Sequence, residues 1–328
     1  MERITRSEVA RKAGVSKTTV TYVLKETPGV HLSGETREKV KRIAAELGYE
    51  PDFAATSLVR GKTSIIGLLL PSQEAQFVGY YARMIAGLLD ASQDTPYHFL
   101  YLGQNHPEKY IHCFARGYLD AFIVLQSRTD PTHVAAVRRF GKPGLTMNYQ
   151  NDQGIPQVSM DYEAAMDAAY GILLDRGRRR IAFLCYRRAC QPNIRHIERH
   201  GELARRFSDR AEIVYVEPDP YPDLAAACEA RIRGGGWDGF VVDGLEASVE
   251  LRRVAAAEGR RLGVDCDLVI LCTEENTPKP QPGVWILEAQ PHRVGMEAWS
   301  LMERILKGES VEPSVQIPFR LLSPGKES

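Results

Sequence analysis

Five polar side chains near the N-terminus have the chemistry needed to contact a surface rich in phosphates and hydrogen-bond acceptors. They follow the spacing i, i+1, i+4, i+5 and i+8, which places them on one face of a helix: Lys17, Thr18, Thr21, Tyr22 and Lys25. Ammonium and hydroxyl groups donate hydrogen bonds to phosphate oxygens and to base edges, and this face carries little acid. The pattern indicates a helix that contacts nucleic acid.

The flanking sequence supplies a frame that would hold this helix at the surface. Thr5 and Glu8 predict a capping box at the start of a first short helix, and Gly14 predicts its end. Ser16 predicts the cap of the second helix. The apolar side chains that would face inward are Val20, Val23 and Leu24. Two helices joined by a tight Gly turn are typical of the helix-turn-helix unit, whose second helix enters the major groove.

The alternative is a small helical hairpin that packs on another part of the chain. A third helix, begun by Ser33 and spanning 35–47, argues against it because three short helices can share one core. Its apolar stripe consists of Val40, Ile43, Ala44 and Leu47.

Residues 9–62 resemble the DNA-binding head and hinge of the LacI/GalR (lac repressor) family. The resemblance lies in four stretches at fixed spacing: Val-Ala-x-x-Ala-Gly-Val-Ser-x-x-Thr-Val from Val9, 35–40, Glu-Leu-Gly-Tyr-x-Pro from Glu46, and Ala-x-Ser-Leu from Ala55. It implies that Lys17, Thr18 and Tyr22 reach base edges. The family often has Arg where Tyr22 stands, so the preferred half-site should differ there, because a tyrosine cannot contact guanine bidentately.

The matched positions that contact phosphate in the family carry hydroxyl, imidazole or ammonium groups. They are Thr5, Ser16, Thr19, Thr21, Lys25, His31 and Thr36. For each hydroxyl the alternative role is simple helix capping, and Thr5 and Ser16 can serve both roles.

The hinge at 52–60 is too short for a stable isolated helix, so its folding should be coupled to DNA binding. Ala55 and Leu58 match DNA-contacting hinge positions, and Leu58 matches the residue that wedges between base pairs in the minor groove. The alternative is that Leu58 packs on the rest of the chain. Two hinges must meet for the wedge to work, which implies a homodimer on a palindromic operator.

Composition agrees with a basic head on a larger body. The 328 residues carry no formal net charge, but residues 1–62 hold 12 Lys and Arg against 8 Asp and Glu. This excess suits phosphate contact at one end only, although it is too small to establish DNA binding alone. The six cysteines form no Cys-x-x-Cys pair, which favours free thiols in a reducing compartment.

From residue 64 onward, apolar strands alternate with helices. Strands are expected at 65–71, 97–102, 119–125, 144–148, 180–186, 212–216, 239–243 and 267–272, separated by helices at 77–92, 107–116, 131–140, 162–176, 193–207, 221–234 and 245–259. This alternation favours an α/β body of two doubly wound parallel-sheet subdomains with a cleft between them. The family resemblance implies a body similar to periplasmic sugar-binding proteins, with the chain crossing between its halves three times.

The expected domains are a helix-turn-helix head at 1–50, a hinge at 51–63 and an effector-binding and dimerisation domain at 64–328. One half of that domain would comprise about 64–160 plus 291–318, and the other about 161–290 plus 319–328.

The resemblance also implies an effector site in the cleft. Positions that match family pocket regions are Phe77, Asn148, Asp161, Arg195, Arg199, Asp243, Glu274 and Trp285. Aromatic faces, carboxylates and a basic group suit a hydroxylated ligand such as a sugar or sugar derivative. The chain departs from the family at Ala75–Val78, Tyr149 and Gly244, and the match slips near 194–202, so a surface or core role is the alternative for each position.

Rival classes lack their motifs. The sequence contains no Gly-x-Gly-x-x-Gly after a strand, P-loop, Gly-x-Ser-x-Gly or His-Glu-x-x-His, so no enzyme activity, cofactor or metal is predicted. His196 and His200 have helical spacing, but no third ligand stands at motif distance. The N-terminus runs directly into a polar helix without a signal peptide, and no membrane span is expected, which favours the cytoplasm.

The sequence thus predicts an effector-controlled transcriptional regulator, with repression expected from the resemblance alone. A ligand-independent or activating regulator, or a solute-binding body with a vestigial head, remains the alternative.

Overall fold

The computed structural model describes residues 4–25, 29–50, 57, 61–70, 79–103, 107–125, 138–148, 154–186, 195–207, 210–216, 222–234 and 236–325. The chain divides into two compact units, Met1–Thr63 and Ser64–Ser328, called here the head and the body. Among the described helices, none combines the length and apolar character required to cross a membrane.

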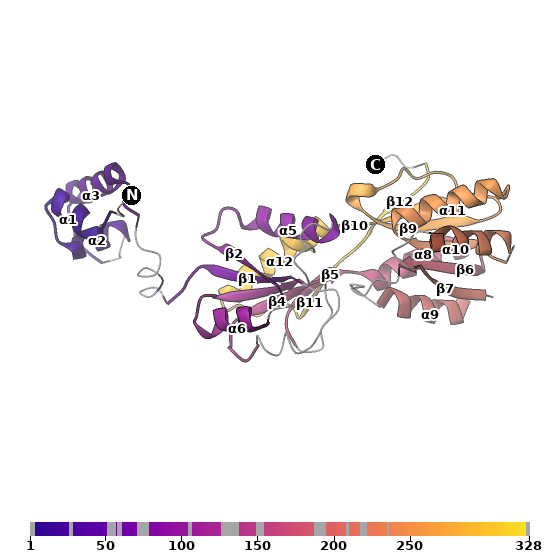
Figure 1. Ribbon diagram of the computed structural model, residues 1–328, viewed down its shortest axis with the longest axis horizontal. Helices are drawn as coiled ribbons and strands as arrows, with labels where there is room; N and C mark the ends of the chain where they lie inside the picture. The colour runs from indigo at the N-terminus through magenta and orange to yellow at the C-terminus, as the bar shows by residue number, and fades with distance from the viewer. Residues whose placement is uncertain are drawn as a thin grey trace. The chain divides into compact units, whose positions relative to one another are not determined.

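The head consists of three helices around one small core (Figure 1). They are α1 (Arg6–Ala13), α2 (Lys17–Leu24) and α3 (Gly34–Leu47). Gly14 and Gly48 adopt left-handed conformations, with φ of 70° and 64°, and each ends the helix before it. The buried side chains meet from all three helices: Val9, Ala10, Ala13, Val20, Val23, Val40, Ile43 and Ala44. The expected third helix therefore completes the core of the first two.

The first half of the body is a six-stranded parallel sheet in the order β11-β5-β4-β3-β1-β2. Its strands are β1 (Ile65–Leu70), β2 (His98–Gly103), β3 (Ala121–Leu125), β4 (Gly144–Met147), β5 (Gln157–Met160) and β11 (Ser314–Ile317). Helices α5 (Gly79–Ser92) and α12 (Pro291–Leu306) cover one face, and α6 (Pro107–Ala115) packs on the other. Strands buried on both faces explain the continuous apolar runs in the sequence.

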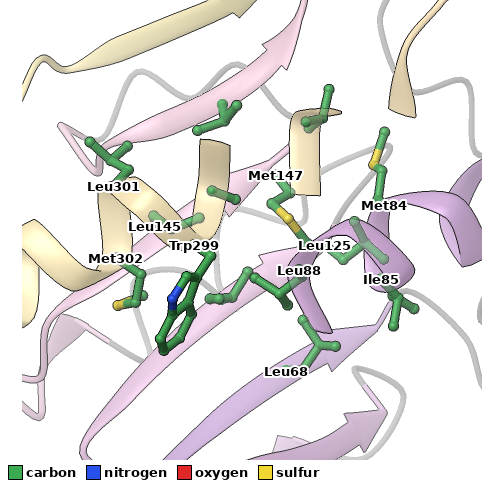
Figure 2. Close-up of a cluster of buried hydrophobic side chains, with 14 of the residues drawn as sticks. Leu68, Met84, Ile85, Leu88, Leu125, Leu145, Met147, Trp299, Leu301 and Met302 are labelled. Atoms are coloured by element: carbon green, nitrogen blue, oxygen red, sulfur yellow. The ribbon is translucent and has the colours of Figure 1, made fainter. Parts of the chain in front are cut away.

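The main core of this half lies between the sheet and the α5–α12 pair. Figure 2 shows Trp299, Leu301 and Met302 of α12 together with Met84, Ile85 and Leu88 of α5, among side chains from the strands. The strand residues labelled there are Leu68, Leu125, Leu145 and Met147.

The second half of the body repeats this architecture in the order β12-β10-β9-β8-β6-β7. Its strands are β6 (Arg180–Tyr186), β7 (Arg210–Val216), β8 (Gly239–Asp243), β9 (Asp267–Thr273), β10 (Val284–Ala289) and β12 (Arg320–Leu322), of which only β12 is antiparallel to its neighbour in the described sheet. Helices α10 (Pro222–Arg233) and α11 (Leu245–Ala257) pack on one face, and α8 (Tyr162–Asp175) and α9 (Arg195–Phe207) on the other.

The chain passes between the two sheets three times: after β5, after β10 and between β11 and β12. The predicted fold class, a helix-turn-helix head with a body of two doubly wound halves, is confirmed. The alternation pattern did not name the strands β5, β10, β11 and β12 or the helix α12. Residues 131–137 of the helix expected at 131–140 lie outside the described residues.

Candidate functional site

The polar face of α2 is presented to solvent, because its opposite face is fixed in the head core. Val20 and Val23 are fully buried, whereas Lys17, Thr18 and Tyr22 are exposed. These three side chains lie within the first two turns, where a recognition helix contacts base edges. Their exposure is what a base-reading role requires.

Three of the hydroxyls predicted to contact phosphate, those of Ser16, Thr19 and Thr36, take part in capping helix N-termini. Ser16 Oγ accepts a hydrogen bond of 3.0 Å from the Thr19 amide and lies 2.9 Å from the Thr19 hydroxyl. Ser33 plays the same part for α3, with Thr36 as its partner. Capping leaves the hydroxyls at the helix N-termini, where exposed amides favour an anion. Both roles considered for these hydroxyls are therefore compatible.

At the start of α1, Thr5 donates two hydrogen bonds to the Glu8 carboxylate. The amide and hydroxyl of Thr5 donate to Glu8 Oε2 over 2.7 and 2.8 Å. The hydrogen bond from the Thr5 backbone, followed by that from its hydroxyl, lowers the pKa of the Glu8 carboxyl.

Arg6 connects the two helices of the motif. Its guanidinium donates a hydrogen bond of 2.7 Å to the Thr21 hydroxyl, which itself donates to the Lys17 carbonyl. This contact fixes α1 against the polar side of α2. Sequence reasoning did not single out Arg6, because a contact over 15 residues leaves no periodic signal.

The remaining predicted DNA contacts are partly described. His31 is exposed ahead of α3, and Lys25 is half-buried at the end of α2. Ala55 and Leu58 lie outside the described residues, as do the other hinge residues from 51 to 60 except Ser57.

A second group of polar side chains gathers at the junction between the two halves of the body. Asn148, directly after β4, is fully buried and adopts a left-handed conformation with φ of 56°. Its Oδ1 accepts a hydrogen bond of 3.0 Å from the Tyr80 hydroxyl of α5. Its Nδ2 has no hydrogen-bond partner among the described residues. A buried amide donor left unpaired is costly, and strained backbone is a feature of binding sites.

Tyr80 also meets Tyr162, the first residue of α8, with 3.2 Å between the two hydroxyls. Burial raises the pKa of both tyrosines, and the nearby Asp243 carboxylate at the end of β8 raises them further. Both hydroxyls therefore stay neutral and able to donate at physiological pH. Asp161 caps α8 by accepting from the Ala164 amide over 2.9 Å.

Glu274 follows β9 in the short helix η2 (Glu274–Asn276) and pairs with Arg83 of α5. The junction thus brings together three predicted positions, Asn148, Asp243 and Glu274, and Asp161 stands beside Tyr162.

Two other predicted effector residues have different neighbours. Arg199 of α9 binds Asp167 and Glu202 through a 2.7 Å and a 2.9 Å contact. Trp285 lies near the beginning of β10 under the guanidinium of Arg176, the residue that ends α8. Because Tyr162 begins that helix, Trp285 stands at the end remote from the junction. Phe77 and the Arg195 side chain lie outside the described structure.

Tyr80, Tyr162 and Arg83 belong to the junction but were missed from the sequence. Tyr80 and Arg83 lie three apart at the start of α5, which is the spacing of one helix face. That spacing was the only local signal, and the partners of these side chains are 68 to 191 residues away.

The comparisons with known proteins agree with this architecture. Residues 5–52 match the family model described as bacterial regulatory proteins, lacI family. Catabolite control protein A of Priestia megaterium is 25% identical, with 97% of each chain covered. Catabolite control protein B of Bacillus subtilis is 29% identical over 56% of this chain and 58% of its own.

Solved structures share the fold along nearly the whole chain. A lac repressor dimer bound to operator and the anti-inducer ONPF has a TM-score of 0.78 at 20% identity, covering 98% of both chains. The regulator CelR in complex with cellobiose has a TM-score of 0.64 at 22% identity, also with 98% coverage of both. Head, body and relatives thus agree: residues 5–52 carry the DNA-binding head of the lacI family of bacterial regulatory proteins, and the whole chain shares the fold of the lac repressor.

Proposed function

We propose that this protein is a cytoplasmic repressor that binds a palindromic operator as a homodimer and responds to a small hydroxylated effector. The observation that carries the proposal is the exposed polar face of α2, held by a buried apolar face within a complete three-helix head. The lac repressor structure that shares this fold is a dimer on its operator.

Within the head, Lys17, Thr18 and Tyr22 would contact bases. The phosphate contacts would come from the residues around the helix N-termini and the two basic side chains: Thr5, Ser16, Thr19, Thr21, Lys25, His31 and Thr36. Ala55 and Leu58 would enter the minor groove from the hinge. Such phosphate contacts release counterions, so affinity should fall as salt rises. A plot of the logarithm of the binding constant against the logarithm of the salt concentration should have a slope of about −0.9 per phosphate contacted.

Fluorescence anisotropy of the full chain on a duplex of arbitrary sequence tests this head. Lys25→Ala should weaken binding and reduce the salt slope, because Lys25 is a proposed phosphate contact, whereas Lys279→Ala, an exposed lysine of the body, should change neither. A salt slope near zero for the unaltered protein would count against DNA binding by the head.

The homodimer is supported by apolar side chains on a strand edge that has no neighbour within the described sheet. β2 is the outer strand of the first sheet, and Leu100 and Tyr101 on it are 38% and 44% exposed. Leu89 on the adjoining helix α5 is 42% exposed. A long apolar edge invites pairing with another chain, and a second copy with two-fold symmetry would bury it.

Sedimentation of Leu100→Arg and Tyr101→Glu variants tests this surface. Both should shift the protein towards monomer, whereas Val264→Arg, at an exposed apolar residue of the second half, should leave the assembly unchanged. If both edge variants remain dimers, the dimer interface does not include the β2 edge.

The effector would bind at the body junction, where Asn148 Nδ2 offers an unused donor beside the Tyr80 and Tyr162 hydroxyls. Asp161, Asp243 and Glu274 would add hydrogen-bond acceptors for the effector. The weaker candidates for effector contact are Arg199, Trp285, Arg195 and Phe77. Neutral hydroxyls and carboxylates together suit a ligand with several hydroxyl groups, and the fold neighbour CelR was solved with cellobiose.

A thermal-shift screen of sugars and sugar derivatives, repeated on Asn148→Ala, tests the effector site. A ligand that stabilises the unaltered protein and not the variant would support it. A ligand that stabilises both equally would place binding outside the junction.

A further inference from the structure

One ion-pair cluster joins the two halves of the body through side chains. Arg83 on α5 of the first half donates from Nε and Nη2 to Glu274 Oε1 over 3.1 and 3.0 Å. Its Nε also lies 3.4 Å from Glu275 Oε1. Both glutamates belong to η2 of the second half, so one guanidinium binds two carboxylates across the junction.

Gly79 makes this approach possible. It is the first residue of α5, and a Cβ placed on it would come within 2.8 Å of Glu275 Oε2. The carboxylate therefore rests against the beginning of a 14-residue helix, where the helix dipole favours negative charge. The α5 start and η2 are thus complementary in shape as well as in charge.

The three side chains keep contact with water. Arg83, Glu274 and Glu275 are 36%, 25% and 41% exposed. Ion pairs at such sites add little to folding stability because water and salt compete for the charges. A weak contact of this kind is suited to biasing two conformations that are close in free energy.

We propose that Arg83, Glu274 and Glu275 form a latch that holds the two halves of the body together, and that breaking it shifts the body towards a more open conformation. The latch itself does not depend on the proposed function. Its regulatory consequence does, because only in a DNA-binding regulator would the shift reach the operator.

Single-molecule energy transfer in the full chain tests the latch without DNA or effector. Cysteines substituted for exposed Lys109 on α6 and Ala226 on α10, in a chain whose native cysteines are replaced, would carry the dyes. Labelled protein would be diluted in unlabelled protein to avoid transfer between protomers. Arg83→Glu and Glu274→Arg should each lower the ratio of high-transfer to low-transfer molecules by roughly three- to tenfold. The combined variant should recover most of the ratio, because it reverses the pair and keeps its attraction.

Two controls separate the latch from general damage. Arg253→Glu breaks a comparable exposed pair with Glu250 within α11 alone, and it should leave the ratio unchanged. Salt at about 1 M, where the screening length is about 3 Å, should open the body of the unaltered protein as the substitutions do. The same salt should cause little further opening in the Arg83→Glu variant. If charge reversal impairs folding, Arg83→Gln and Glu274→Gln should give a smaller shift in the same direction.

Unchanged ratios in the single variants would overturn the latch. Single variants that open the body without recovery in the combined variant would overturn it too, since any disruptive substitution could do that. Because the readout is distance alone, the latch can fail while DNA binding holds, and the reverse.

Discussion

Gly295 of α12 lies directly against Gly87 of α5, so closely that neither position has room for a side chain. A Cβ on Gly295 would stand 1.9 Å from the Met84 carbonyl oxygen and 3.0 Å from the Gly87 carbonyl carbon, and one on Gly87 would stand 1.9 Å from the His292 carbonyl oxygen. This backbone contact seats the two helices on the first sheet.

Gly295→Ala should therefore destabilise the first half by about 1–3 kcal/mol, because backbone and not a flexible side chain must move. The unfolding midpoint in thermal denaturation would fall by several degrees. Gly171→Ala is the matched control, since Gly171 lies within α8 with open space around it. That substitution should be neutral or stabilising, because alanine favours helix. Equal effects at the two positions would contradict the packing argument.

Tyr22→Arg should change base preference at one position of each half-site towards guanine. Tyr22 is exposed on α2 and offers one hydroxyl, whereas Arg can donate two hydrogen bonds to guanine, with about 1–3 kcal/mol of discrimination. Site selection with both proteins measures this. Identical selected sites would mean that Tyr22 does not contact a base.

Leu58→Ala should weaken binding to the selected operator while leaving binding to arbitrary duplex nearly unchanged. The reason is that a wedge acts only where the duplex is kinked, whereas phosphate contacts act everywhere. Competition titrations against arbitrary duplex give the specificity ratio. A ratio equal to that of the unaltered protein would exclude the wedge.

Tyr80→Phe should reduce effector affinity by up to about tenfold, because it removes the hydroxyl that orients Asn148 at a buried site. Calorimetric titration with the ligand found by the screen measures the effect. Tyr118→Phe, at a tyrosine that is 46% exposed, is the control and should bind normally. If Tyr80→Phe and Tyr118→Phe bind the effector with equal affinity, the Tyr80 hydroxyl does not contribute to the effector site.

Glu8 predicts a pH dependence in the head. Its pKa is lowered in the folded state by the Thr5 hydrogen bonds, so the stabilisation is complete above its ordinary pKa of 4.5 and is lost as pH falls through the folded value. Amide exchange of α1 should show greater protection than in Glu8→Gln at about pH 7, and the difference should vanish towards about pH 3. A constant difference across this range would contradict the charge-based explanation.

The head was predictable because its signals are local. Gly14, Ser16, Ser33 and Gly48 each end or begin a helix within a few residues, so residue type alone fixes the boundary. The alternating strands and helices of the body were predictable for the same reason.

The junction was not predictable to the same degree, since its contacts are distant in sequence. Asn148 could be named from the family pattern, but its hydrogen bond with Tyr80 spans 68 residues and the Arg83–Glu274 pair spans 191. The short strand β5, with four buried residues, has no alternation to detect. The sequence places Trp285 among the effector residues, whereas the structure places it near the start of β10, beside Arg176 and away from the junction. Residue type alone does not show where along a strand a side chain lies.

Selection of bound sites from a random duplex library with the full-length protein tests the central proposal most directly. The account predicts a palindrome whose half-sites are related by two-fold symmetry, with a flexible, kinkable step at its centre. That result would require a base-reading head, a dimer and a wedging hinge together. A selected pool with no common sequence would contradict the proposal that this chain recognises an operator.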